Sequence, residues 1–357
     1  MQAIAVRRGE STPVVVDRPR PEPGPGEALV RTLRVGVDGT DHEVLAGGHG
    51  SVPDGEDLLV LGHEAVGVVA DPNGTDLREG EVVVPTVRRP PAGGSDYFDR
   101  GEPDMAPPGE YRERGIDGAH GFMAAFFTSP AEYLVSLPAS LADHGFLLEP
   151  LSVAAKALEL AEASRSTFAW DTEVAVVLGN GSLGLLTLAV LGDECDRTYC
   201  VGRRDRPDPT VDLIESLGAT YVDSRETPVA AFPDAHEAAD LVVEATGHPP
   251  HALESVHALA PNGVLALLGV PADATLELDA GAYHRSMVLG NRAVVGSVNS
   301  AVRHFETAAE WLADLSDGFV DDLVTGVYGL GEFERAFAAD DTTIKTAVEF
   351  GTHEERR

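Results

Sequence analysis

One histidine and three carboxylates in the first half of the chain have the residue types of a divalent-metal site. Asp38 lies in the run GVDGTD, and His63 and Glu64 follow in GHEAVGVV, with His63 25 positions after Asp38. Glu149 directly precedes Pro150. An imidazole with carboxylates forms an N/O ligand set, and three protein ligands with an open fourth position are typical of catalytic zinc. Spacing alone leaves the alternative open, because a His–Glu pair is often structural and Asp-Gly is above all a turn signal.

A glycine-rich run, GNGSLG, predicts a dinucleotide-binding loop. It follows the apolar run VAVVL and precedes the helical run LLTLAVL. In G-x-G-x-x-G the first glycine permits a tight turn, the second lets the backbone approach a pyrophosphate, and the third lets helix and strand pack closely. The phosphates then lie on N–H groups at the helix N-terminus. The predicted loop comprises Gly179, Asn180, Gly181, Ser182, Leu183 and Gly184.

The next apolar run ends in arginines where an NAD site would carry a carboxylate. NAD-specific sites place Asp or Glu about 20 residues after the glycine loop, to bind the ribose 2′-hydroxyl. Here the chain has Gly202, Arg203, Arg204 and then Asp205. Guanidinium groups bind phosphate bidentately, whereas a carboxylate would repel it. We therefore expect Arg203 and Arg204 to bind the 2′-phosphate of NADP, and Asp205 leaves NAD open as a second coenzyme.

The first 150 residues, which must position the metal candidates, predict a β-rich domain. Turn runs such as PRPEPGPGE and DPNGTD separate short β-branched segments. Short strands with closely spaced turns are typical of all-β domains with long loops. The expected strands are 14–16, 28–35, 65–69 and 82–84, and 85–115 is expected to be a long surface loop or lobe.

The pattern changes at Glu149-Pro150, where a helix is expected to begin and where we place the domain boundary. Apolar runs then alternate with helical patterns, which predicts a doubly wound parallel sheet of six strands. The amphipathic stretch 301–315 and the strand-like 346–350 are expected to complete the first domain. The expected strands are 174–178, 198–202, 219–222, 240–245, 263–270 and 293–298, and the expected helices are 183–191, 209–217, 250–259 and 279–289.

The composition limits the partners and the compartment. The formal net charge of −33 excludes nucleic-acid binding, which needs a basic surface, and argues against an anionic membrane. The sequence shows neither a signal peptide nor a membrane span, and the two cysteines, Cys195 and Cys200, favour a cytoplasmic location. Lysine occurs only at positions 156 and 345. This favours an enzyme adapted to concentrated salt, where the Debye length falls to about 3 Å; an ordinary acidic enzyme stays possible.

These motifs resemble those of the zinc-dependent medium-chain dehydrogenase/reductase family. GHEAVGVV matches the family signature GHE-x-x-G-x-x-V, and GVDGTD matches its GVCGTD loop with Asp38 in place of cysteine. EPLSV at 149–153 matches the polyol and glucose dehydrogenase branch, while GEYRERGI at 109–116 and GSVN at 296–299 resemble the archaeal, halophilic glucose 1-dehydrogenases. The resemblance implies an α/β protein of two domains. A GroES-like, β-rich catalytic domain would cover 1–152, completed by 301–357, and a Rossmann domain that binds NADP would cover 153–300.

The resemblance also implies roles for individual residues. Asp38 and His63 would bind zinc directly, and Glu64 and Glu149 directly or through water. Thr40 would contact the reacting hydroxyl and pass its proton outward. Glu113, Glu149 and Asn299 would bind the sugar. The nicotinamide end of the coenzyme would lie against Thr246, Gly247, Leu268, Gly269, Val270, Ser297, Val298 and Asn299.

Three departures from the family pattern have consequences. A carboxylate at position 38 is a harder ligand than a thiolate, so we expect a labile zinc. The family's structural-zinc lobe uses four cysteines, and 86–115 contains none, so we expect no structural zinc. Asp96, Asp99 and Glu102 there are interpreted as a solvated face. Val153 replaces an aspartate that binds substrate in some relatives.

The resulting hypothesis is a zinc-dependent glucose 1-dehydrogenase that oxidises D-glucose at C1 to gluconolactone, with hydride transfer to NADP, or to NAD. Such an enzyme would serve sugar catabolism of the Entner–Doudoroff type and form a homodimer or homotetramer, as its family does. One alternative is a zinc-dependent polyol or alcohol dehydrogenase of the same family. A zinc-free quinone or enone reductase would have no use for the histidine and carboxylates together. A non-enzymatic NADPH-binding sensor would need only the glycine loop and the arginines.

Overall fold

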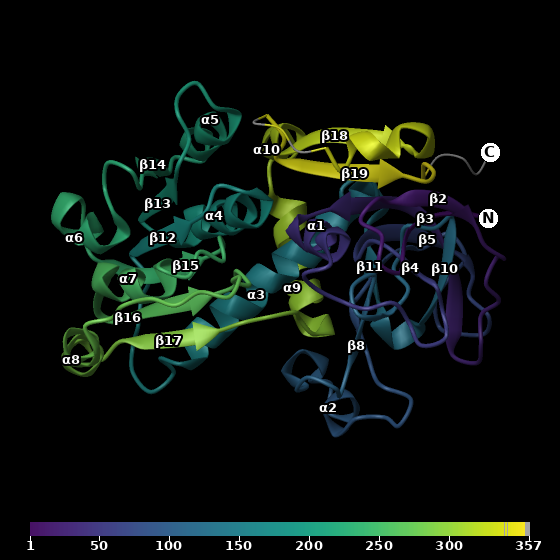
Figure 1. Cartoon of the computed structure of the whole chain (residues 1–357), viewed down its shortest axis with the longest axis horizontal. Coiled ribbons are helices and arrows are strands. Elements are labelled where there is room, and N and C mark those ends of the chain that lie inside the picture. The colour runs from purple at the N-terminus through teal and green to yellow at the C-terminus, as the bar shows by residue number, and fades with distance from the viewer. Residues whose placement is uncertain (339, 341, 354–357) are drawn as a thin grey trace. The chain divides into compact units, whose positions relative to one another are not determined.

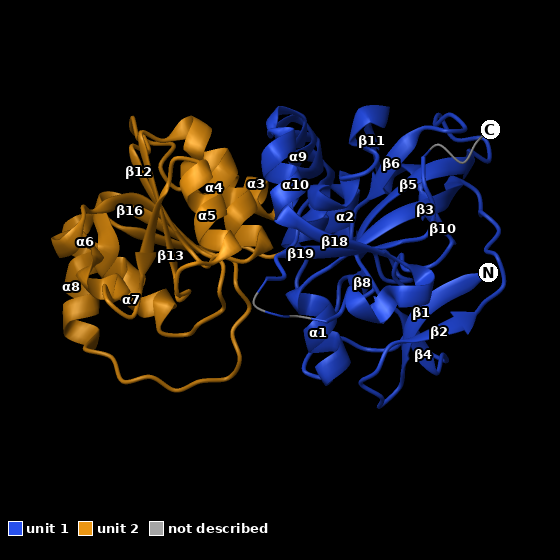
Figure 2. Cartoon of the chain, turned by 90° about the horizontal axis from the view of Figure 1, so that it is seen from above, with its two compact units in different colours: residues 1–152, 299–357 blue, residues 153–298 orange. Residues whose placement is uncertain are grey.

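The computed structural model describes residues 1–338, 340 and 342–353 of the chain. The chain forms two compact units (Figure 2): unit 1 comprises Met1–Ser152 with Asn299–Arg357, and unit 2 comprises Val153–Val298. Asn299 and Ser300, which the sequence analysis assigned to the second domain, lie in unit 1, where the Ser300 and Ser152 hydroxyls are 2.6 Å apart. None of the described helices is both long and apolar enough to span a membrane.

Unit 1 is built mainly from three sheets, and Figure 1 labels several of their strands. The first, in the order β2-β1-β4, joins β1 (Gln2–Arg7), β2 (Val14–Asp17) and β4 (Leu58–Val60). The second, in the order β11-β6-β5-β3-β19-β18 with β10 also on β3, joins β3 (Glu27–Val37), β5 (Glu64–Asp71), β6 (Val82–Pro85), β10 (Phe126–Pro130), β11 (Leu134–Leu137), β18 (Val324–Gly329) and β19 (Lys345–Glu349). The third joins β7 (Arg88–Arg89), β8 (Arg112–Arg114) and β9 (Gly118–Ala119).

The core of unit 1 explains why chain segments far apart in sequence fold together. Ile4, Val30, Phe122 and Val348 are fully buried in one cluster. Burial of each such side chain contributes roughly 1.5–3 kcal/mol. β19 pairs antiparallel with β3, so the last described strand completes the sheet that the first 150 residues begin.

Helices are more numerous in unit 1 than the all-β interpretation allows. The α-helices are α1 (Gly39–Ala46), α2 (Asp96–Asp99), α9 (Val302–Asp314) and α10 (Asp317–Leu323), and the 3-10 helices are η1 (Pro103–Met105), η2 (Ala131–Tyr133), η3 (Ala139–Leu141), η4 (Gly145–Leu147) and η6 (Leu330–Arg335). The expectation of an all-β domain was wrong at α1. This helix is short and only weakly amphipathic, so its sequence pattern does not indicate a helix, but Asp38 and Gly47 cap its two ends. The expected loop at 85–115 contains α2, η1 and the paired strands β7 and β8.

Unit 2 contains a parallel sheet of six strands in the order β14-β13-β12-β15-β16-β17. The predicted doubly wound sheet is confirmed. Its central strand β12 is buried at every position, as expected of a strand covered on both faces. The strands are β12 (Val174–Leu178), β13 (Arg197–Gly202), β14 (Thr220–Asp223), β15 (Ala239–Glu244), β16 (Leu259–Leu267) and β17 (Ala293–Gly296).

The helices of unit 2 follow the strands, as the alternating sequence pattern predicts. They are α4 (Ser182–Glu194), α5 (Pro209–Ser216), α6 (Phe232–Ala235), α7 (His251–Ala258) and α8 (Ala280–Gly290), with the 3-10 helix η5 (Val229–Ala231). Helix α3 (Leu148–Ala163) begins two residues before Pro150, which occupies its first turn. β16 ends at Leu267 and β17 at Gly296, earlier than expected, so 268–270 and 297–298 are loop residues at the carboxyl ends of these strands.

Candidate active site

Asp38 stands between strand β3 and helix α1 and serves both as a helix cap and as a candidate ligand. Its Oδ1 accepts a hydrogen bond from the Asp41 N–H at 3.0 Å, and Asp41 Oδ2 accepts one from the Asp38 N–H at 3.2 Å. This reciprocal capping fixes the Asp38 side chain at the helix N-terminus. Its other oxygen, Oδ2, lies 3.6 Å from His63 Nε2.

Strand pairing brings His63 and Glu64 to the same place. Glu64 begins β5 and is the register partner of Gly36 on β3, two residues before Asp38. A Cβ at Gly36 would collide with the Glu64 carboxylate, so this position needs glycine. One ligand atom from each of Asp38, His63 and Glu64 lies within 4.8 Å of the other two. The structure therefore brings together three of the four predicted metal ligands.

Glu149, the fourth predicted ligand, is not part of this group of three. It lies in the first turn of α3 and is buried, with 7% of its surface exposed. Burial raises the pKa of Glu149 to about 8; His63 opposes this rise, and Glu64 and Asp38 add to it. Glu149 is thus close enough to interact electrostatically with the group of three, in line with a ligand that binds through water.

Lys345 is the residue of this site that the sequence analysis missed. It begins strand β19, is 1% exposed, forms an ion pair with Glu64 and donates a hydrogen bond to the Val37 carbonyl at 3.2 Å. It lies more than 280 residues after Glu64 in the chain, beyond the reach of any spacing argument. The chain has only two lysines, and this rarity was the feature of the sequence that could have drawn attention to Lys345.

The pKa values show that the pocket holds an excess of acidic groups. Burial by itself would lower the pKa of His63, but Asp38 raises it well above its ordinary value. Burial also raises the pKa of Asp41 to about 7, and the charge of Asp38 adds to the rise. Lys345 stays charged, since Glu64 and Asp38 outweigh the effect of its burial and raise its pKa. The Lys345 ammonium group and the His63 imidazole thus face four carboxyl groups.

This arrangement fits a divalent metal ion. A buried cation would favour the ionised forms of Glu149 and Asp41, whose pKa values are otherwise raised by burial and by neighbouring carboxylates. His63 Nδ1 and Asp41 Oδ1 are buried and have no hydrogen-bond partner among the described residues. The imidazole and carboxylate donors suit zinc, which accepts both N and O ligands.

In unit 2 the predicted glycine loop connects β12 to α4. Gly179 has φ +114°, which disfavours any residue with a side chain, and a Cβ at Gly184 would collide with the Gly179 carbonyl. Gly181 caps α4, and a Cβ there would meet nothing within 4 Å. The loop therefore combines close strand–helix packing with open space at the helix N-terminus, which fits a pyrophosphate.

The arginine pair follows β13, the strand beside β12. Gly202 ends β13, and a Cβ there would lie 2.9 Å from both Asn180 Oδ1 and the Tyr221 ring. Asn180 in turn donates to the Thr210 hydroxyl at 2.5 Å, which ties the glycine loop to α5. The Nε of Arg204 lies 3.8 Å from Asp208, the cap of α5. The predicted phosphate ligands thus stand on a loop that is connected to the glycine loop.

The remaining coenzyme candidates of unit 2 lie at the carboxyl ends of its other strands. Glu244, at the end of β15, accepts hydrogen bonds from the N–H groups of Thr246 at 2.8 Å and Gly247 at 3.3 Å. Backbone bonds from Leu268 and Gly269 to the Glu244 carbonyl, at 2.9 and 3.1 Å, hold the next loop beside them. Val270 and Val298 are exposed, by 58% and 52%, while Ser297 is buried. These loops share the sheet edge where doubly wound folds bind ligands.

The sugar-binding candidates of unit 1 have mixed settings. Thr40 lies in the first turn of α1, two residues after Asp38, and is half-buried. Glu113 is buried, and its Oε1 accepts a hydrogen bond from Arg88 Nε at 3.0 Å. Asn299 has φ +58° and accepts a hydrogen bond from the Ser300 N–H at 2.9 Å. Glu113 is therefore held by a buried arginine, and its role toward a sugar stays a prediction.

Both parts of the chain match models of known families. Residues 24–139 match the alcohol dehydrogenase GroES-like domain, and residues 142–350 match the glucose dehydrogenase C-terminus. A GroES-like unit with a buried histidine–carboxylate group, together with a Rossmann unit, defines the class of zinc-dependent medium-chain dehydrogenases. Within this class, the chain belongs to the glucose dehydrogenase family. The resemblance stated from the sequence motifs is confirmed.

Individual relatives are similar over nearly the whole length. The chain is 66% identical to glucose 1-dehydrogenase of Haloferax mediterranei over 356 residues, which cover 99% of this chain and 100% of that protein. It is 62% identical to glucose 1-dehydrogenase of Halobacterium salinarum over 355 residues, with the same coverage. The structure of the Haloferax mediterranei enzyme in complex with NADP, Zn and gluconolactone matches with a TM-score of 0.97 at 66% identity, covering 99% of this chain and 100% of that one. These halophilic sources agree with the high-salt interpretation of the composition.

Proposed function

We propose that the chain is a glucose 1-dehydrogenase that oxidises D-glucose at C1 to gluconolactone and reduces NADP to NADPH. The buried group of Asp38, His63 and Glu64 carries this proposal, since a sensor that merely binds a dinucleotide would not need it. The relative that is 66% identical was solved with NADP, Zn and gluconolactone, which supports the same coenzyme, metal and product here.

The residues of unit 1 would bind the metal and move the proton. Asp38 and His63 are the proposed direct ligands, and Glu64 and Glu149 bind directly or through water. When bound, zinc supplies Lewis acidity toward the C1 oxygen, and NADP accepts the hydride from C1. Thr40, in the first turn of α1, accepts a hydrogen bond from the C1 hydroxyl and donates its own proton to neighbouring water or carboxylate as the C1 proton arrives, so that the proton passes outward. The products are gluconolactone, NADPH and one proton, so atoms and charge balance.

The residues of unit 2 would bind the coenzyme. The N-terminus of α4 and the open space at Gly181 receive the pyrophosphate. Arg203 and Arg204 bind the 2′-phosphate and so favour NADP over NAD. Thr246, Gly247 and the loops after β16 and β17 line the nicotinamide side.

A turnover experiment tests the proposed reaction. The purified chain is assayed in concentrated salt with NADP and a panel of D-glucose, D-galactose, D-xylose and polyols, before and after EDTA treatment and after return of zinc. We expect NADPH formation with D-glucose that EDTA abolishes and zinc restores. Activity that survives complete metal removal would overturn the zinc proposal. Turnover of polyols but not of glucose would favour the alcohol dehydrogenase alternative, and coenzyme binding without any turnover would favour a sensor.

A matched pair of variants tests the phosphate site. Arg203→Gln/Arg204→Gln is expected to raise KM for NADP by about 100-fold or more, because charge-assisted hydrogen bonds contribute about 1.5–3 kcal/mol each. KM for NAD should change little. Arg197→Gln is the control. Arg197 begins strand β13, at the end opposite the arginine pair, and forms an ion pair with Glu237. Equal changes for NADP and NAD would contradict the assignment.

We further propose that the chain works as a homodimer or homotetramer in the cytoplasm. β17 is an edge strand whose one partner among the described residues is β16, and Val288 and Leu289 on the preceding helix are 64% and 79% exposed. Unpaired edges and exposed apolar side chains favour association. The thiols of Cys195 and Cys200 are free, in line with a reducing compartment. Light scattering in concentrated salt measures the mass, and a monomeric mass would contradict the first proposal.

A further inference from the structure

The arginine loop after β13 carries negative charge close to the proposed phosphate ligands. Asp205 directly follows Arg204. Asp223 ends β14 and is the register partner of Gly202, the residue before Arg203. Arg225 and, more weakly, Arg203 lower the pKa of Asp223, so this carboxyl is ionised and Arg203 is near it. A phosphate monoester carries about −1.5 to −2 charges at neutral pH, and both aspartates would repel it.

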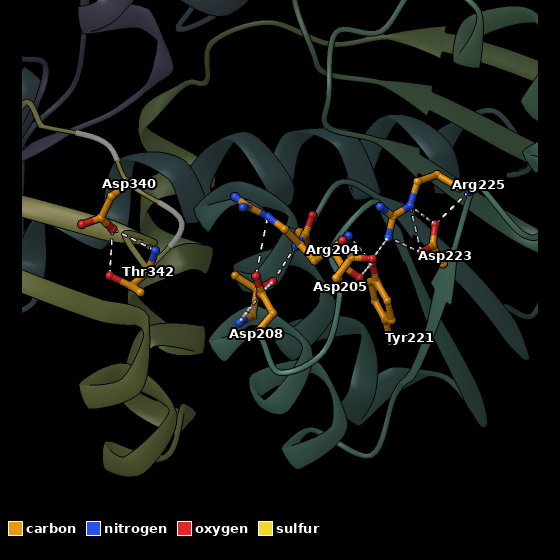
Figure 3. Close-up of polar contacts among 10 residues, drawn as sticks. Arg204, Asp205, Asp208, Tyr221, Asp223, Arg225, Asp340 and Thr342 are labelled. Carbon is orange, nitrogen blue, oxygen red and sulfur yellow. Dashed lines mark hydrogen bonds and ion pairs between the residues drawn. The ribbon is translucent and has the colours of Figure 1, made fainter.

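Arg225 binds both of these aspartates. Its Nη2 lies 2.6 Å from Asp205 Oδ1 and 2.6 Å from Asp223 Oδ2 (Figure 3). Its Nε lies 3.0 Å from each oxygen of Asp223, and its backbone N–H donates to Asp223 Oδ1 at 2.8 Å. Arg225 is therefore anchored on Asp223 through a fork of parallel hydrogen bonds and reaches from there to Asp205.

Tyr221 fixes the backbone of the same loop. Its hydroxyl accepts a hydrogen bond from the Arg204 N–H at 2.6 Å and donates one to the Arg204 carbonyl at 3.1 Å. Figure 3 shows Tyr221, Asp223 and Arg225 close to Asp205. Because β14 carries Tyr221 and Asp223, with Arg225 two residues further on, this one segment sets both the position of the arginine pair and the charge beside it.

We propose that Arg225 determines coenzyme choice by offsetting part of the negative charge of Asp205 and Asp223, the carboxylates that flank the proposed 2′-phosphate site. Tyr221 is a positioning residue for the same site. The inference rests on the proposed binding of NADP at Arg203 and Arg204. It adds residues that act on this site without binding the coenzyme themselves. With Arg225 in place, Asp205 is held by a cation and the repulsion of a phosphate is offset. Without it, Asp205 loses its cation and Asp223 keeps only the weaker influence of Arg203, so the repulsion of a phosphate increases. NAD, which has a hydroxyl at this position, is indifferent to the change.

The test compares four forms of the full chain: the natural sequence, Arg225→Gln, Asp205→Asn and the double variant. The Kd values for NADPH and NADH are measured by fluorescence titration without substrate, at two salt concentrations that keep the chain folded. Arg225→Gln is expected to raise the Kd for NADPH by about twofold to fivefold, as for loss of an exposed charge pair, and to leave that for NADH unchanged. Adding Asp205→Asn should recover part of the loss, because it removes one of the two repelling charges.

Three further variants separate charge from structure. Arg225→Lys keeps the cation and should retain most of the preference for NADPH. Arg197→Gln removes the same charge from the opposite end of β13 and should leave the Kd ratio unchanged. Tyr221→Phe removes both hydroxyl contacts and should weaken NADPH binding more than NADH binding.

The outcomes distinguish this inference from the proposed function. If Arg225→Gln weakens NADPH and NADH equally, or if Asp205→Asn gives no recovery, the role of Arg225 is structural and the inference fails. If Arg203→Gln/Arg204→Gln leaves the affinity for NADPH unchanged, the proposed phosphate site itself fails. Loss of NADPH affinity in that double variant, with none in Arg225→Gln, refutes the present inference alone.

Discussion

Replacing Lys345 by methionine tests the electrostatic account of the metal pocket. Lys345 and Glu64 are each 1% exposed, and they form an ion pair inside unit 1. Methionine keeps most of the volume but removes the charge, so the Glu64 carboxylate loses its buried cation. Removal of one partner of a buried pair costs about 3–5 kcal/mol, because the other charge stays desolvated. Loss of the hydrogen bond to the Val37 carbonyl adds about 1 kcal/mol.

The expected change is large enough for a thermal melt. In a folding body of about 150–250 residues, 1 kcal/mol shifts Tm by roughly 2–4 °C. Loss of the ion pair alone therefore predicts a fall of about 6–20 °C, measured by circular dichroism in concentrated salt with EDTA present. Bound zinc should recover part of the fall, because it supplies positive charge to Glu64 in place of the missing ammonium group.

The double variant Glu64→Gln/Lys345→Met distinguishes a lost charge pair from a packing defect. Removing both charges together is often close to neutral, so the double variant should be more stable than Lys345→Met alone. Arg78→Met is the control, since Arg78 is 87% exposed and its pair with Glu81 is worth at most about 1 kcal/mol. A Lys345→Met protein that melts within 2 °C of the natural chain, or a double variant no more stable than the single one, would refute the reasoning.

Three further predictions concern the ligand, the glycine loop and pH. Asp38→Cys should retain zinc longer during dialysis, as measured by metal analysis, because a thiolate binds zinc more tightly than a carboxylate. The free energy of unfolding of the metal-free variant should fall by about 1 kcal/mol, because the side-chain cap of α1 is lost. Unchanged zinc retention would mean that Asp38 is not a ligand. Gly184→Ala should lower the melting temperature, because the added Cβ would collide with the backbone at Gly179, whereas Gly181→Ala should melt like the natural chain but bind NADPH weakly. Calorimetry measures the first effect and titration the second. A Gly184→Ala variant as stable as the natural chain would contradict the packing role given to Gly184. Burial would raise the pKa of Glu244, but hydrogen bonds from His251 and its own turn lower it, so its stabilising effect is complete above its ordinary pKa of 4.5 and is lost as pH falls below that value. The difference in free energy of unfolding between the natural chain and Glu244→Gln should therefore shrink as the pH falls. A difference that grows in acid would contradict the lowered pKa of Glu244.

The sequence was sufficient for features that depend on local pattern. Buried parallel strands such as β12 are short apolar runs, and the loop from Gly179 to Gly184 connects one to a helix in the expected way. The six-stranded sheet could therefore be predicted with its strand boundaries displaced by a few residues. The largest displacement falls at β16, which begins at Leu259 instead of 263, because an irregularity in its pairing with β15 lets the polar segment Pro261–Gly263 continue the strand.

The candidate metal site could be predicted only in part, because its members come from distant strands. Asp38, His63 and Glu64 were found through motifs. Lys345 was not, since its place beside Glu64 depends on β19 pairing with β3, a contact between residues about 310 positions apart. Likewise, Arg225 acts on Asp205 through the pairing of β13 with β14, which no spacing within the arginine loop indicates.

The two lysines connect the composition of the chain to its interior. A surface adapted to concentrated salt favours carboxylates and disfavours lysine, and this pressure applies where side chains meet solvent. Lys156 and Lys345, the only lysines, are 3% and 1% exposed, so neither contributes to that surface. Each donates to a backbone carbonyl, at Val298 and Val37 respectively. A compact ammonium on a flexible stem can reach such sites inside a packed core, where the larger planar guanidinium of arginine would need more room. The bias against lysine therefore concerns the protein surface, and both remaining lysines lie in the interior, where that pressure does not act.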